Sequence, residues 1–129
     1  MTIQVPVSVG ELLDKLTILA IKLERIDDPA KLVNIAREHA ALEAVVQAER
    51  LRAPEGVTAL EQELRAVNEQ LWRIEDEIRE HERQQRFDDG FIALARAVYR
   101  TNDQRAALKG RLNALTGSEL VEEKSYAAY

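Results

Sequence analysis

The chain has 129 residues, of which 46% are hydrophobic and 32% are charged, and its formal net charge is −5. It contains no cysteine, which excludes disulfide bonds, thiolate metal ligands and a cysteine nucleophile. The acidic balance argues against a nucleic-acid partner, and no stretch approaches the roughly 18 apolar residues of a membrane span.

The N-terminal residues predict an extended arm followed by a helix. Residues 1–7 alternate apolar and polar side chains, but Pro6 cannot donate to a sheet, so we expect an arm or an edge strand. They lack the basic stretch and apolar run of a secretory signal, so we expect a cytoplasmic protein. Ser8 and Glu11 form a capping-box pattern that opens a helix. Its apolar stripe consists of Leu12, Leu16, Leu19, Leu23 and Ile26.

Two further helices follow, each with its own start signal. Asp28 and Pro29 open the second helix, because proline is tolerated at the first helical position. Its stripe is Leu32, Ile35, His39, Leu42 and Val46. Thr58 opens the third helix in the capping-box pattern T-A-L-E, which ends at Glu61. Its stripe is Leu60, Leu64, Val67, Leu71, Ile74, Ile78 and His81.

The fourth helix is predicted from Asp89-Gly90 to Thr116-Gly117. Its stripe is interrupted by two polar residues, Thr101 and Arg105, which stand where apolar side chains should continue. The remaining positions of the stripe are Leu94, Val98, Leu108, Leu112 and Leu115. Residues 118–129 are too few and too polar for a core helix, so we expect a tail that Tyr126 and Tyr129 anchor on the bundle or on a protein partner.

Short connections between four helices predict an all-α fold, an antiparallel up-down bundle of four helices in one domain over residues 1–129. The third and fourth helices, each about 38 Å long at 1.5 Å per residue, exceed the first. We therefore expect part of their hairpin to overhang and to pair with a second subunit in a homodimer. Residues 58–85 carry a net charge of −4 and residues 90–112 a net charge of +4, which indicates that these two helices are neighbours.

Metal and nucleophilic chemistry have weak support in the sequence. The two histidines stand four residues from a glutamate, in His39–Glu43 and Glu77–His81, whereas di-metal bundles use Glu-x-x-His. The three serines have no histidine nearby in the sequence, and no glycine-rich phosphate loop is present. We therefore expect no metal and no cofactor.

Polar residues near the middle of three helices are the candidate site. We expect them to meet in one layer; the candidate ligand-binding residues are Asp14, Asn68, Trp72, Glu75, Arg79, Asn102, Arg105 and Lys109. One interpretation is structural, since a polar layer can fix the register of a bundle, with Trp72 covering it. The other is a pocket between helices in which arginine and lysine receive an anion and a carboxylate acts as a base.

Four long phrases resemble a family of small bacterial proteins that is known only as a domain of unknown function: VPVSVGELLDKLTILAIKLERI, VNEQLWRIEDEIR, FIALARAVYRTNDQRAALKGRLN and LVEEKSYAAY. The resemblance covers nearly the whole chain. It implies a soluble, single-domain, mostly helical protein and supplies no catalytic residue, cofactor or activity. Ala97 departs from the pattern, in which serine is expected.

Two functions remain open on the sequence. The first is a non-catalytic interaction or accessory protein whose tail or overhanging hairpin engages a partner. The second is a small enzyme or binding protein for an anionic metabolite that uses the polar residues between the helices.

Overall fold

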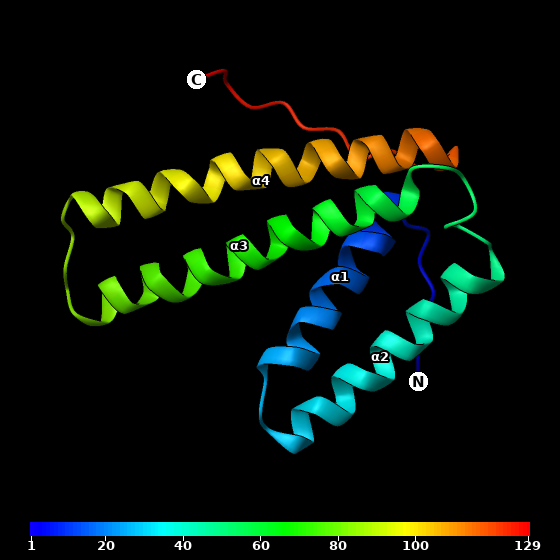
Figure 1. Ribbon diagram of the computed structural model, residues 1–129, viewed down its shortest axis with the longest axis horizontal. Coiled ribbons are helices and arrows are strands. Elements are labelled where there is room, and N and C mark those ends of the chain that lie inside the picture. Colours follow the sequence, from blue (N-terminus) through cyan, green and yellow to red (C-terminus); the bar gives the residue numbers. More distant parts are fainter.

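The computed structural model describes residues 1–129 and contains four helices: α1 Val9–Arg25, α2 Pro29–Ala48, α3 Val57–Arg83 and α4 Asp89–Thr116. They form two antiparallel hairpins, α1–α2 and α3–α4 (Figure 1). The prediction of an all-α four-helix bundle is therefore confirmed. Residues 1–7 and 118–129 form neither helix nor strand.

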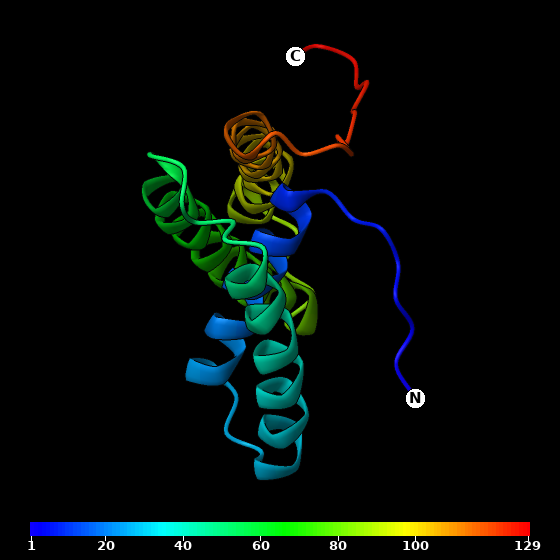
Figure 2. The same ribbon diagram turned by 90° about the vertical axis from the view of Figure 1, so that its right-hand side faces the viewer.

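Helix α1 is the centre of this arrangement. It lies against α2, α3 and α4, whereas α2 has only α1 as a neighbouring helix. The α1–α2 hairpin therefore extends away from the α3–α4 hairpin, as the turned view in Figure 2 shows. The tertiary structure depends on how α1 is held against the longer hairpin.

Three of the predicted helix starts and the predicted end of the fourth helix are correct. The Ser8 hydroxyl accepts from the backbone N–H of Glu11 at 3.2 Å, and Asp28 and Asp88 cap α2 and α4 in the same way. Gly117 ends α4 with φ of 64°, a left-handed conformation that glycine adopts without steric cost.

The predicted start of α3 at Thr58 is wrong. The helix begins at Val57 after Gly56, whose φ of 92° requires a glycine, and no side chain caps it. Glu61 does not close a capping box, because its carboxylate receives two hydrogen bonds from Arg52 at 2.8 and 2.9 Å. The capping-box pattern fails here because Arg52, in the loop before α3, binds the glutamate that the box requires.

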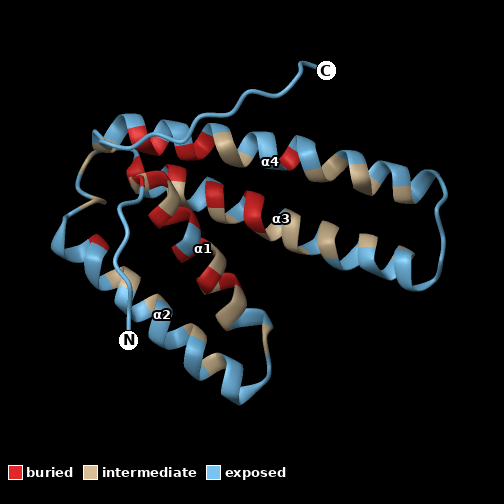
Figure 3. Cartoon of the chain, turned by 180° about the vertical axis from the view of Figure 1, so that it is seen from behind, coloured by how far each residue is buried: buried red, intermediate tan, exposed pale blue.

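The hydrophobic core lies where α1 crosses the first part of α3 and the last part of α4, and buried residues gather there in Figure 3. Leu13, Leu64 and Leu112, one from each helix, are completely buried. The other members of the cluster are Leu12, Leu16, Val46, Val57, Leu60, Val67 and Leu108. Helix α2 contributes only Val46, so most of its stripe is half-buried against α1.

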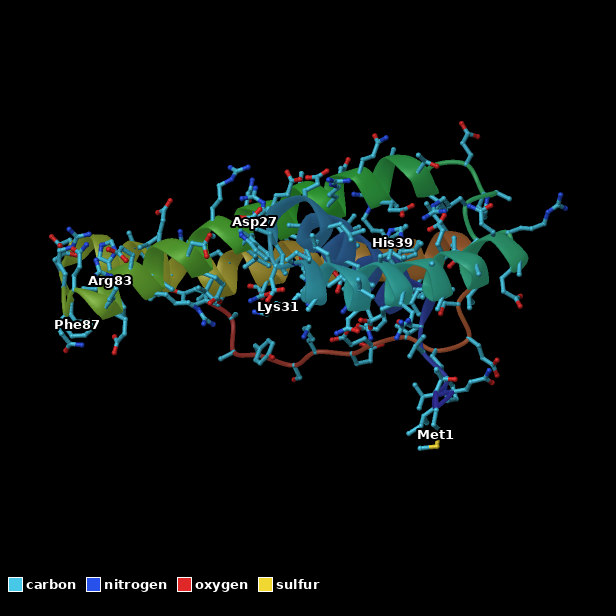
Figure 4. The ribbon with its side chains drawn as sticks, turned by 90° about the horizontal axis from the view of Figure 1, so that it is seen from below. Met1, Asp27, Lys31, His39, Arg83 and Phe87 are labelled. Carbon is cyan, nitrogen blue, oxygen red and sulfur yellow. The ribbon has the colours of Figure 1, made fainter.

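The α3–α4 hairpin continues beyond α1, as predicted. We call residues 71–100 the overhang; none of them is buried. α3 and α4 lie side by side there, and α1 reaches only the beginning of the overhang, where Arg25 lies over Trp72 (Figure 1). Figure 4 shows Arg83 and Phe87 at the tip of the overhang, and Met1 projecting away from the helices.

The opposite charges of α3 and α4 did indicate neighbouring helices, but no arginine or lysine of either helix pairs with an acid of the other; His81 lies 3.7 Å from Asp88, which caps α4. The acids of α3 instead pair along their own helix, with Arg65–Glu69 and Arg79–Glu75 four residues apart. Such exposed pairs contribute little to stability, about 0.3–0.5 kcal/mol each.

The closest approach of α1 to α4 gives a test with a matched control. A Cβ at Gly10 would lie 2.5 Å from the backbone oxygen of Lys109, whereas a Cβ at Gly110 would meet nothing within 4 Å. We expect Gly10→Ala to lower the free energy of unfolding by about 1–3 kcal/mol, because a backbone atom must move. Gly110→Ala should raise it by about 0.5–1 kcal/mol, because alanine favours a helix interior. Urea unfolding of both variants would contradict this packing if Gly10→Ala were neutral.

Candidate functional site

A strip of polar side chains runs along the face of α4 that meets α1. Thr101, Arg105, Lys109 and Asn113 follow one another at intervals of four residues, which places them on one face of the helix. All except Arg105 are buried, and the Arg105 side chain is 27% exposed. The strip lies beside Leu108 and Leu112, the two α4 residues that belong to the hydrophobic core.

Asp14 of α1 is the centre of the contacts that this strip makes. Its carboxylate is 1% exposed and accepts two hydrogen bonds from the Arg105 guanidinium, at 2.9 Å from Nε and 2.5 Å from a terminal nitrogen. The Asn68 side-chain amide of α3 donates to the same carboxylate at 2.9 Å and to the Thr17 hydroxyl at 2.8 Å. One buried carboxylate thereby joins three helices.

Two further contacts repeat this pairing toward the start of α1. Lys109 donates to the Glu11 carboxylate at 2.6 Å, and the backbone N–H of Gly10 donates to the Asn113 side chain at 2.7 Å. Because α1 and α4 are antiparallel here, residues with higher numbers in α4 contact residues with lower numbers in α1. We call this set of contacts the polar ladder: Asp14–Arg105, Glu11–Lys109 and Gly10–Asn113.

The charges of the polar ladder are matched within the protein. The hydrogen bonds from Arg105 to Asp14 raise the pKa of Arg105 above its usual value, against the opposing effect of burial. Burial lowers the pKa of Lys109, but its hydrogen bonds to Glu11 and Glu122 outweigh burial and leave that pKa raised. No buried side-chain nitrogen or oxygen lacks a hydrogen-bond partner. This complete pairing is what a structural polar layer requires.

A groove lies beside the polar ladder, between α4 and the C-terminal tail. Its volume is about 1220 Å³, and the tail runs back along α4 to form one wall (Figure 1). The wall on the helix side includes Tyr99, Asn102, Asp103, Arg105 and Lys109, and Glu11 joins it from α1. The tail side consists of Glu122, Lys124 and residues 126–129.

Polar contacts hold the tail at both ends of the groove. Glu122 accepts from Lys109 at 2.8 Å and from Lys124 at 3.1 Å, which lowers the pKa of Glu122. At the far end the Tyr129 hydroxyl donates to Asp103, and its ring meets Tyr99 edge-on with 5.2 Å between centroids. The tail is thus attached to the same α4 surface that carries the ladder.

A model of a family of unknown function (DUF6165) matches residues 3–129 of the chain. The chain belongs to this family. Neither the curated proteins nor the solved structures gave a match. Membership thus brings no activity, cofactor or catalytic residue with it, and the function has to be argued from the site. None of the four helices has the length and apolar character that crossing a membrane requires.

The structure brings together four of the residues that the sequence singled out: Asp14, Asn68, Arg105 and Lys109. Asn102 is exposed in the groove.

The expectation that Glu75 would join the polar layer is wrong. It lies on the overhang, two turns beyond Asn68 and past the reach of α1, and it pairs with Arg79. Trp72, one turn after Asn68, packs under the Arg25 guanidinium, which lies 5.9 Å from its ring centroid.

Sequence reasoning missed Asn113 and the contacts of Glu11 and Glu122. The four-residue spacing that links Thr101, Arg105, Lys109 and Asn113 was available as a signal for the first of these. The glutamates had no comparable signal, because their partner Lys109 is far away in the sequence.

The Glu122 carboxyl group reports the attachment of the tail. Its folded pKa is lowered, so the contact is present above the usual value of 4.5 and is lost as the pH falls through the lowered value. We expect Lys109→Met to return the Glu122 pKa toward 4.5 and to increase the mobility of residues 120–129, both measured by NMR. Lys124→Met, which removes the smaller cause, should have less effect; equal effects would contradict the assignment of Lys109 as the main tether.

Proposed function

We propose that the protein is a non-catalytic interaction protein that forms a homodimer and offers its C-terminal tail to a protein partner. The observation that carries this proposal is the overhang, which has no buried residue over 30 positions of a helical hairpin. Stable helical layers bury their apolar stripes against another layer, and beyond α1 no second layer covers this hairpin.

The surface of the overhang fits a second copy of itself. Phe87 and Ile92 are 54% and 53% exposed, which provides apolar side chains for an interface. Residues 71–83 of α3 carry a net charge of −2 and residues 89–100 of α4 a net charge of +1. A two-fold related copy would place α3 of one overhang against α4 of the other, so that two hairpins make a four-helix layer with opposite charges facing.

The tail supports the second part of the proposal. Tyr126 and Tyr129 are 78% and 76% exposed, and Leu120 and Val121 are 45% and 53% exposed. Aromatic side chains are enriched in protein interfaces, where a rigid ring provides a large contact area. A tail with these four side chains is a candidate element for binding a protein partner.

The alternative of an enzyme or a binding protein for an anionic metabolite has less support. Arg105 and Lys109 are the cations that would receive the anion, but Asp14 and Glu11 of α1 already neutralise them. An anion would have to displace a carboxylate that is itself held in place. We also propose the cytoplasm as the compartment, since the chain has no cysteine that an oxidising compartment would pair.

A charged residue introduced into the overhang tests the proposed homodimer. We expect light scattering to give the wild-type protein twice the chain mass of 14.6 kDa, and Ile92→Glu to give the mass of a monomer. A glutamate at this exposed position can stay solvated in the monomer but would be buried in the interface, which is costly.

Val33→Glu is the matched control, because Val33 is 58% exposed on α2, away from the overhang. This variant should remain a dimer. A wild-type protein that stays monomeric at high concentration, or a dimer that Ile92→Glu leaves intact, would refute the interface.

A further inference from the structure

The groove between α4 and the tail has one firm wall and one loosely attached wall. On the firm side, Arg105 is held by Asp14, and Lys109, whose side chain is 10% exposed, is held by Glu11. These contacts do not involve the tail, so the cations of the groove keep their positions without it. The helix wall is therefore preformed for whatever lies against it.

The loosely attached wall is the tail itself. Every residue from Glu119 to Tyr129 is exposed, and Leu120 and Val121 leave 45% and 53% of their surface exposed. What holds this segment is the Glu122 ion pair at one end and the Tyr129 contacts at the other. Lys109 keeps its Glu11 partner when Glu122 leaves, and the Tyr129 contacts are exposed, so another segment with the same groups can replace the tail.

The tail shows which chemistry the groove accepts. One carboxylate meets Lys109, and seven residues later an aromatic ring meets Tyr99 while its hydroxyl reaches Asp103. The Arg100 guanidinium also lies over that ring, 6.0 Å from its centroid. The two attachment points select an extended segment with an acidic residue and a tyrosine at this separation.

We propose that the firm wall of the groove is a docking site for an extended segment of a partner protein that carries a carboxylate and, about seven residues later, a tyrosine, and that the tail lies against this wall as a tethered competitor. This rests on the proposed interaction function and specifies its partner surface. A tethered ligand acts at a high effective concentration, so only a segment that binds better than the tail displaces it.

The test uses a fluorescein-labelled peptide with the sequence of residues 117–129 as the probe and the full-length chain as the receptor. Glu122→Ala/Tyr129→Ala detaches the tail without touching a buried side chain, since both residues are exposed. We expect the peptide to bind this double variant at least about tenfold more tightly than the wild type, whose own tail is attached to Lys109 and Asp103 of the firm wall. The anisotropy of the peptide measures both affinities.

Variants of the firm wall locate the binding. Adding Lys109→Met or Asp103→Ala to the double variant should weaken binding about fivefold or more, and a peptide with alanine in place of its glutamate and tyrosine should not bind. Equal affinities for wild type and double variant, or affinities that both wall variants leave unchanged, would overturn the proposal.

A second copy is the other possible occupant of the groove. If the peptide converts a wild-type dimer into monomers in light scattering, the groove holds the tail of a second copy and the assignment to a partner protein is overturned. The proposed dimer can fail separately: a wild-type monomer that binds the peptide as described refutes the overhang interface and supports the groove.

Discussion

The burial of the Asp14 carboxylate is the constraint on which the rest of the structure depends. A charge that is 1% exposed is tolerated only with a close partner and full hydrogen bonding, and Arg105 and Asn68 supply both. Because these partners come from α4 and α3, meeting the requirement fixes where α1 crosses the α3–α4 hairpin. The surrounding leucines fill space but do not select one crossing over its neighbours, whereas a buried ion pair is satisfied in one register only.

The position of α1 determines which surfaces of the α3–α4 hairpin stay exposed. Helix α1 has 17 residues against 27 in α3 and 28 in α4, so a crossing near one end of the hairpin leaves the other end as the overhang. The same crossing places Lys109 beside Glu11 and forms the firm wall of the groove. Core, overhang and groove therefore follow from one set of contacts, and the surfaces that we assign to partners are those that α1 does not cover.

The sequence predicted what local patterns determine. Helix periods and caps gave the four helices, and the interrupted stripe at Thr101 and Arg105 indicated the polar layer before its partners were known. The sequence prediction failed where a side chain had two possible partners. Glu61 and Glu11 fitted capping boxes, yet each carboxylate pairs with a cation outside its own helix, Arg52 and Lys109. Glu75 was placed in the layer because the helices were expected to meet at their midpoints, which unequal lengths prevent. The path of the tail depends on long-range contacts that no spacing encodes.

The most direct test of this account is the unfolding of Arg105→Leu in urea beside Arg111→Leu, an exposed arginine on the same helix. Removing Arg105 leaves the Asp14 carboxylate buried without its cation, so we predict a loss of about 3–5 kcal/mol, against less than about 0.5 kcal/mol for Arg111→Leu. Asp14→Leu combined with Arg105→Leu should recover part of the loss, because no unpaired charge then remains. A loss below about 0.5 kcal/mol for Arg105→Leu would contradict the account and would make Arg105 a residue that waits for a ligand.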